Sequence, residues 1–221
     1  MSHYKYHIYL LVFIIILSVF YVKTQTIATL SLPASSKVIV IDPGHGGWDP
    51  GKTVNGMGES IINLKIAMKL KRLIEGAGGR AILTRNDKNA LGKNKSLDME
   101  KRMDIVEKNN ADIFVSIHLN SFPKSRYFGA QTFYYSGSKS GKILAEAIQE
   151  QLIKILDGGN KRQAAISDSY YVLKNTKVPA TIVECGFMSN PEEYKLLQDD
   201  EYQEKVAWAI YLGINKYFDK I

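Results

Sequence analysis

The stretch Val38-Ile39-Val40-Ile41-Asp42-Pro43-Gly44-His45-Gly46-Gly47 joins four β-branched residues to a polar, glycine-rich turn. An unbroken apolar run that ends at Pro and Gly is typical of a strand covered on both faces of a sheet. The glycines allow the backbone to turn sharply and to come close to a ligand. The stretch therefore predicts a buried strand followed by a loop that carries His45.

Strands and helices alternate along the chain on either side of this stretch. Further strands are predicted at residues 80–84, 112–117, 170–173 and 180–183, with an exposed or edge strand at 131–135. Apolar residues at helical spacing predict helices at residues 62–73, 97–109, 143–156 and 201–218. Strands separated by helices indicate βαβ units. The predicted fold class is therefore α/β: a single layered domain with a mostly parallel central sheet flanked by helices.

The N-terminal region differs from this domain. Residues 8–22 read IYLLVFIIILSVFYV, in which Ser18 interrupts an otherwise apolar run, and Lys5 precedes it. The run is shorter than the roughly 20 residues of a membrane-spanning helix and long for a signal-peptide core. We expect an export segment, with cleavage and retention as a membrane anchor both open. Residues 1–36 are thus predicted to be a signal peptide or anchor plus linker, and residues 37–221 the folded domain.

Composition narrows the class of protein. Of 221 residues, 45% are apolar and 23% are charged, as in ordinary globular domains. Cys185 is the only cysteine, which excludes an intramolecular disulfide. The net charge of +7 favours an anionic surface such as wall polymer or lipid headgroups. Nucleic acid is not expected as a partner, because the charges are scattered and no nucleic-acid motif is present.

Two of the four histidines occupy equivalent places in the predicted sheet. His45 and His118 each follow a buried strand, whereas His3 and His7 belong to the N-terminal region. In open α/β sheets, the loops that leave the carboxyl ends of the strands form the active-site crevice. Both imidazoles are therefore expected at one rim.

Two acidic residues are expected near the same rim. Glu184 follows the strand at 180–183, where an acid is costly unless it is paired or functional. Glu59 opens a helix, so its carboxylate fits either a favourable helix-dipole position or a metal ligand. Two histidines and one carboxylate with a fourth position open are a catalytic zinc pattern. A second acid such as Glu184 would serve as the general base in such a site.

Several long motifs, in order, resemble one known family. The quoted stretch extends to Trp48-Asp49-Pro50-Gly51, and Glu59, Asn63-Leu64, Thr84-Arg85 and Arg102 follow. Two further blocks are Ala111-Asp112-Ile113-Phe114-Val115-Ser116-Ile117-His118-Leu119-Asn120 and Pro179-Ala180-Thr181-Ile182-Val183-Glu184-Cys185-Gly186-Phe187-Met188-Ser189-Asn190. Together they resemble the zinc-dependent N-acetylmuramoyl-L-alanine amidases of the type-3 fold. The resemblance covers Lys37 to Phe218.

The resemblance implies roles for individual residues. His45, Glu59 and His118 fall on the family's zinc-ligand positions, and Glu184 falls on that of the catalytic glutamate. Asn120, two residues after the ligand position His118, matches a family position where a side-chain amide could contact the substrate. A purely structural role fits this residue equally well.

Three other residues are expected to support the structure. We predict Arg85 and Arg102 to be ion-paired scaffold residues. Cys185 is predicted to be a small buried residue behind Glu184 rather than a nucleophile.

The layout of an export segment followed by one domain is most similar to the spore-cortex, germination-specific amidases of endospore formers. This similarity implies cleavage of the amide between N-acetylmuramic acid and L-alanine in peptidoglycan, ahead of muramic-lactam formation by another enzyme. It also implies extracytoplasmic action, secreted or membrane-tethered, in the forespore intermembrane or cortex space, and leaves room for a regulatory protein partner. The alternatives are a zinc peptidase that cuts within the stem peptide and a non-catalytic wall-binding module.

Overall fold

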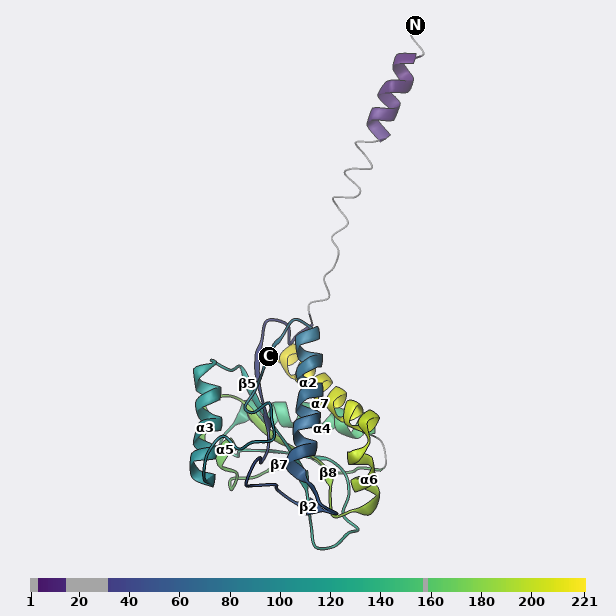
Figure 1. The fold of residues 1–221 in the computed structure, drawn as a ribbon. Coiled ribbons are helices and arrows are strands. Elements are labelled where there is room, and N and C mark those ends of the chain that lie inside the picture. The colour runs from purple at the N-terminus through teal and green to yellow at the C-terminus, as the bar shows by residue number, and fades with distance from the viewer. Residues whose placement is uncertain (1–3, 15–31, 157–158) are drawn as a thin grey trace. The chain divides into compact units, whose positions relative to one another are not determined.

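The computed structural model describes residues 4–14, 32–156 and 159–221 (Figure 1). The chain divides into two units, Met1–Ser31 and Leu32–Ile221. Residues 4–14 of the first unit are helical. Among the described residues, no helix is long and apolar enough to cross a membrane. The predicted export segment at 8–22 and the linker before residue 37 lie partly outside the described residues, so export and the domain boundary remain predictions.

The second unit is built on a six-stranded sheet with the strand order β4-β1-β5-β8-β6-β7. Strand β1 pairs in parallel with β4 and β5, and β5 pairs in parallel with β8. Strand β6 is antiparallel to β8 and parallel to the short β7. The strands of this sheet are β1 (Val38–Pro43), β4 (Arg80–Leu83), β5 (Ile113–Asn120), β6 (Gln131–Tyr134), β7 (Ala165–Ile166) and β8 (Ala180–Phe187). The predicted α/β fold with a mostly parallel sheet is confirmed.

Helices cover both faces of the sheet, α3 and α5 on one side and α2, α4 and α7 on the other (Figure 1). The central position of β1 explains its apolar run at residues 38–41: Ile39 and Ile41 join the core under α2, α4 and α7, while Val40 joins the core under α3 and α5. The helices of this unit are α2 (Glu59–Gly76), α3 (Lys95–Lys108), α4 (Lys139–Leu156), α5 (Tyr171–Asn175), α6 (Pro191–Gln198) and α7 (Asp200–Lys220).

Three local predictions need correction. Residues 170–173 are not a strand, because Tyr170 is extended and α5 begins at Tyr171. Val172 and Leu173 are buried side by side against the α3 face of the sheet, and so short an apolar run does not distinguish helix from strand. The helix predicted at 143–156 begins earlier, at Lys139, and Ile143 is 36% exposed because the buried face of α4 runs through Leu144 and Ile148.

The third correction is a missed helix. Helix α6 begins where the Asn190 side chain accepts hydrogen bonds from the N–H groups of Glu192 and Glu193. Pro191 at the first helical position fits this start.

A two-stranded hairpin brings the chain to the start of α2. Strands β2 (Thr53–Val54) and β3 (Met57–Gly58) pair antiparallel, and Glu59 follows directly as the first residue of α2. The prediction that Glu59 opens a long helix is confirmed. This places Glu59 near the carboxyl ends of the parallel strands.

Candidate active site

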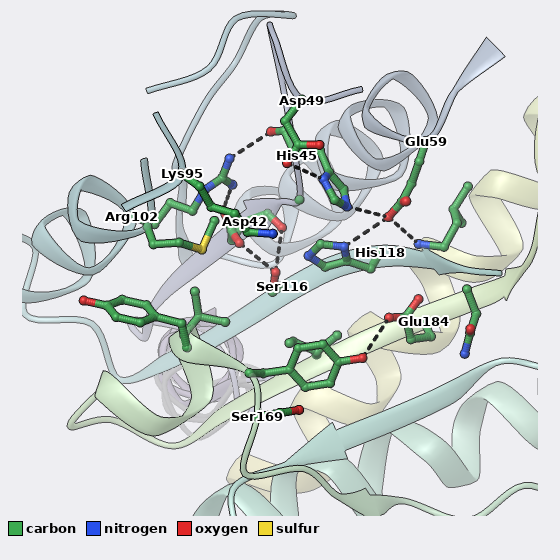
Figure 2. Close-up of a pocket in the computed structure, with 18 of the residues that line it drawn as sticks. Asp42, His45, Asp49, Glu59, Lys95, Arg102, Ser116, His118, Ser169 and Glu184 are labelled. Carbon is green, nitrogen blue, oxygen red and sulfur yellow. Dashed lines mark hydrogen bonds and ion pairs between the residues drawn. The ribbon is translucent and has the colours of Figure 1, made fainter. Parts of the chain in front are cut away.

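A cavity of about 390 Å³ lies at the carboxyl ends of β1, β5 and β8 (Figure 2). Five elements, or the loops beside them, supply the polar side chains His45, Asp49, Glu59, His118, Tyr170 and Glu184 of its lining. The cavity is therefore at the sheet edge where the sequence predicts a site.

His45 lies in the loop after β1 with a φ of 62°, a left-handed conformation that is uncommon for residues other than glycine. Its Nδ1 is 2.8 Å from Oδ2 of Asp49, and its Nε2 is 3.3 Å from Oε1 of Glu59. Burial lowers the pKa of His45, but hydrogen bonds and charges from Glu59 and Asp49 outweigh it and raise the pKa to about 9. Asp49 thus fixes the ring orientation that presents Nε2 to the cavity.

Glu59 is 4% exposed, and its carboxylate points into the cavity instead of capping its helix. Its Oε1 lies 3.0 Å from Nδ1 of His118 and accepts hydrogen bonds from the Leu119 N–H and the Asn63 amide. Burial raises the pKa of Glu59, but its hydrogen bonds to the two histidines hold it well below the usual range. The carboxylate is therefore ionised and directed at both imidazoles.

His118 is the third member of this cluster and belongs to β5. The ligand-capable atoms of His45, Glu59 and His118 all lie within 4.8 Å of one another. The two imidazole rings meet edge to face, with centroids 4.9 Å apart. Such a separation lets three donors face a common point, as a metal site requires.

Two glycines make room for the cluster. A Cβ on Gly44 would lie 2.2 Å from the His118 ring. A Cβ on Gly51, whose φ is +68°, would lie 2.6 Å from Oε2 of Glu59 and 2.8 Å from the His45 ring. Any side chain at either position would push the donors apart.

Glu184 faces the cluster from the neighbouring strand, where it is paired in register with His118. It is 7% exposed, and in the described part of the chain its Oε2 has no hydrogen-bond partner. Its Oε1 is 3.4 Å from the Tyr170 hydroxyl. Burial raises the pKa of Glu184 to about 7, with the His118 and Glu59 charges acting in opposite directions. A buried carboxylate with one free oxygen is suited to exchange a proton near neutral pH.

Two buried arginines hold the loop that carries His45. Arg102 pairs with Asp42 and Asp98 and donates to the backbone carbonyl of His45 at 2.8 Å. Arg85 donates to the carbonyls of Pro43 and Gly44 at 2.9 Å. The predicted ion-paired scaffold is confirmed for Arg102, whereas Arg85 acts through backbone carbonyls and has no ion pair within the described residues.

Other predicted residues have clear places. Asn120 lines the cavity, as a substrate contact requires. Cys185 is fully buried in the core, and burial raises the pKa of its thiol well above the ordinary value. Its predicted role as a packing residue is confirmed.

Two cavity residues escaped the sequence prediction. Asp49 stands only four residues after His45, a short separation that could have pointed to their contact. Tyr170 carried no such signal, because it reaches Glu184 from a distant segment.

The sequence around this site matches one known family of enzymes. The family profile described as N-acetylmuramoyl-L-alanine amidase matches residues 39–216, which include His45, Glu59, His118 and Glu184. The chain belongs to this family. It is therefore an N-acetylmuramoyl-L-alanine amidase that acts on peptidoglycan, and this activity places its work outside the cytoplasm.

Individual amidases of the family resemble this one over most of its length. The germination-specific N-acetylmuramoyl-L-alanine amidase of Bacillus subtilis (strain 168) is 33% identical over 225 residues, which are 97% of this chain and 94% of the relative. The CwlD amidase of Clostridioides difficile, whose structure was solved in complex with the GerS lipoprotein, is 44% identical with a TM-score of 0.81. That match covers 84% of this chain and 100% of CwlD. The catalytic domain of CwlV from Bacillus (Paenibacillus) polymyxa is 30% identical, with a TM-score of 0.74 over 83% of this chain and 98% of CwlV.

Proposed function

We propose that this amidase is a zinc enzyme of the spore cortex that cuts the amide between N-acetylmuramic acid and L-alanine. His45, Glu59 and His118 would hold the zinc ion, and Glu184 would act as general base and acid. The observation that supports this assignment is the three-donor cluster within 4.8 Å, facing a buried Glu184 whose Oε2 has no partner among the described residues.

The donor set fits zinc. Two imidazole nitrogens and one carboxylate oxygen are a common protein ligand set of catalytic zinc, and a fourth position then stays open. Nδ1 of His45 is engaged by Asp49, so Nε2 is the nitrogen available to the metal. A carboxylate partner on the second ring nitrogen is typical of zinc-bound histidines. A zinc ion held by these residues would supply Lewis acidity, the chemistry that activates water and polarises an amide carbonyl.

The remaining steps use side chains of the chain itself. Oε2 of Glu184 accepts a proton from the attacking water as the water adds to the lactyl carbonyl carbon. The same oxygen then returns the proton to the L-alanine nitrogen as the C–N bond breaks. The products are a glycan with a free lactyl carboxylate and a stem peptide with a free amine. Asn120, which lines the cavity, would hydrogen-bond the substrate's amide groups.

The cortex assignment is supported by similarity of nearly full length to the germination-specific amidase of Bacillus subtilis. In this role the cleavage would precede muramic-lactam formation, because ring closure needs the freed lactyl carboxylate. Export through the N-terminal segment, with residues 37–221 as the catalytic domain, would bring the enzyme to that wall. The GerS complex of CwlD supports the further proposal that a protein partner regulates this chain.

A single experiment tests the reaction. The purified chain is incubated with cortex peptidoglycan, with and without a zinc chelator, and the products are identified by mass spectrometry. We expect peptide-free glycan and intact stem peptides, which disappear with the chelator and return with added zinc. Shortened stem peptides, or cleavage that resists chelation, would contradict the proposal.

A further inference from the structure

The loop after β5 carries an unusual amount of exposed aromatic surface. Asn120 and Ser121 line the active-site cavity, and the chain then continues through Phe122-Pro123-Lys124-Ser125-Arg126-Tyr127-Phe128. Phe122 is 46% exposed and Phe128 is 45% exposed. Exposed aromatic side chains beside a cavity are a common mark of ligand-binding surface.

The loop is held in place despite its exposure. The Phe122 N–H donates to the Ser189 hydroxyl at 3.0 Å, and the Gly129 N–H donates to the Glu193 carboxylate at 3.0 Å. Arg162 donates to the carbonyl of Phe128 at 2.7 Å. These bonds tie both ends of the loop to the segment that precedes β7 and the segment that follows β8. A surface fixed in this way loses little conformational freedom when it binds.

The rings within the loop form a continuous series. Phe122 and Tyr127 meet edge to face at 4.6 Å, and Tyr127 stacks on Phe187 at 6.4 Å. The guanidinium of Arg162 lies over the Phe187 ring, 4.6 Å from its centroid. Phe122 therefore stands on packed rings, and Phe128 follows Tyr127 directly in the chain. We call Phe122, Tyr127 and Phe128 the aromatic shelf.

A basic hollow adjoins the aromatic shelf. It encloses about 320 Å³ and is lined by Arg126, Lys161 and Arg162 together with Tyr127 and Phe128 of the shelf, with no acidic side chain among the lining residues. Arginine and lysine at such a place favour carboxylate ligands. The shelf and hollow thus combine flat apolar surface with positive charge.

We propose that the aromatic shelf and its basic hollow bind the peptidoglycan strand next to the bond that is cut. The aromatic rings stack on an amino-sugar ring, and the cations pair with carboxylates of a neighbouring stem peptide. The proposal rests on the proposed function, because it assumes that the cleaved amide lies in the cavity beside Asn120.

Two observations favour peptidoglycan over a protein partner as the occupant. The shelf begins where the cavity wall ends, since Asn120, the last residue of β5, and Ser121 both line the cavity and Phe122 follows them directly in the chain. A polymeric substrate that enters the cavity must also extend over its rim. The surface further pairs apolar rings with cations, and peptidoglycan offers the matching sugar faces and carboxylates.

The first test compares two substrates of the full chain. One is a long uncross-linked glycan strand with stem peptides, and the other is a disaccharide-peptide. We expect the double variant Phe122→Ala/Phe128→Ala to raise KM for the long strand about tenfold, with KM for the disaccharide-peptide unchanged. Trp208→Ala removes an aromatic residue of similar exposure, 44%, from α7 and is expected to change neither. Equal losses on both substrates, or no loss on the long strand, would overturn the proposal.

The second test measures binding without catalysis. Full-chain protein is sedimented with insoluble peptidoglycan, in the Glu184→Gln background to prevent cleavage. We expect Arg126→Gln/Lys161→Gln to weaken binding several-fold at low salt and to reduce its salt dependence. These two exposed side chains can change without disturbing the core, so the test also holds if the double phenylalanine variant fails to fold. Unchanged binding together with lost affinity for a lipoprotein partner would assign the shelf to protein instead. Because this measurement requires no catalysis, a chain that binds peptidoglycan as expected but shows no amidase activity would contradict the proposed function and not the role of the shelf.

Discussion

Glu59 and Glu184 are two carboxylates of one cavity, each less than 10% exposed, yet their surroundings are opposite. Glu59 accepts hydrogen bonds from the backbone N–H groups of Lys52 and Leu119 and from the side-chain amide of Asn63. It also faces the imidazoles of two histidines. Glu184 has one long contact, to the Tyr170 hydroxyl at 3.4 Å.

The pKa values of the two acids diverge accordingly. That of Glu59 lies well below the ordinary value, and that of Glu184 is raised to about 7. A carboxylate that accepts several hydrogen bonds stays ionised and is suited to hold a cation. A buried carboxylate with few hydrogen-bond donors can take up and release a proton near neutral pH. One cavity can therefore separate metal binding from proton transfer, and this separation can be tested one carboxylate at a time.

The largest effect is expected from Glu184→Gln. The amide keeps the shape of the side chain but cannot accept the proton of the attacking water, so kcat should fall about 10³-fold. Zinc content should stay at the level of the unmodified chain, because Glu184 is not one of the three clustered donors. Amide cleavage measured by released amine, together with metal analysis, checks both parts. A variant that loses zinc along with activity would show that the two carboxylates do not have separate roles.

Glu59→Gln should give the converse result. Without the negative charge between His45 and His118, we expect zinc affinity to fall by more than about 100-fold, beyond the 10- to 100-fold typical of residues that only support ligands. Activity should recover at high zinc concentration if Glu184 is undisturbed. Glu75→Gln is the matched control, because Glu75 is an exposed carboxylate on the same helix that pairs with Lys71. Zinc binding of normal strength in Glu59→Gln would remove Glu59 from the ligand set.

Strand β1 and Glu59 show which features could be predicted from the sequence and which could not. Strand β1 could be predicted because four consecutive β-branched residues fit a strand covered on both faces. Glu59 could not be assigned from the residues alone, since a first-turn acid serves the helix dipole and a metal equally well. Only the side-chain direction distinguishes them: no side chain caps α2, and the carboxylate meets both histidines.

Contacts distant in sequence were beyond prediction for a different reason. Tyr170 reaches Glu184 because its segment lies beside β6, where the Ser167 N–H donates to the Tyr134 carbonyl at 2.9 Å and the Tyr170 ring meets Phe133 edge to face at 5.7 Å. Residues 170–173 offer only a short apolar pattern, which does not reveal this placement. Local periodicity therefore predicted the main elements, while the partner of Glu184 depended on tertiary packing.

The pH dependence of zinc binding tests the metal-binding role of the cluster around Glu59. The metal-free His45 has a pKa of about 9, above the ordinary 6.5, so its imidazole carries a proton at pH 7 that zinc must displace. Zinc affinity should therefore rise about tenfold per pH unit from pH 7 and level off near pH 9. Competition with a chelator of known affinity measures this.

A matched variant checks the cause of this pH dependence. Asp49→Asn removes one of the two carboxylates that raise the pKa, so its plateau should begin at lower pH. Affinity that is flat between pH 7 and 9 in the unmodified chain would contradict the assignment of His45 as a ligand.

The smallest effect is expected on the Glu184 side, from Tyr170→Phe. Burial, with the nearby Glu184, raises the pKa of Tyr170 to about 12, so the phenol is neutral and can donate its hydrogen to Oε1. Losing one long hydrogen bond should lower kcat about two- to tenfold, with KM and zinc content unchanged. Tyr135→Phe, in the same apolar cluster but with no contact to Glu184 in the described structure, is the control. Because the bond acts only through Glu184, Tyr170→Phe should add no further loss to Glu184→Gln. If Tyr170→Phe lowers kcat by the same factor in the unmodified chain and in Glu184→Gln, the hydroxyl acts on the substrate directly and not through Glu184.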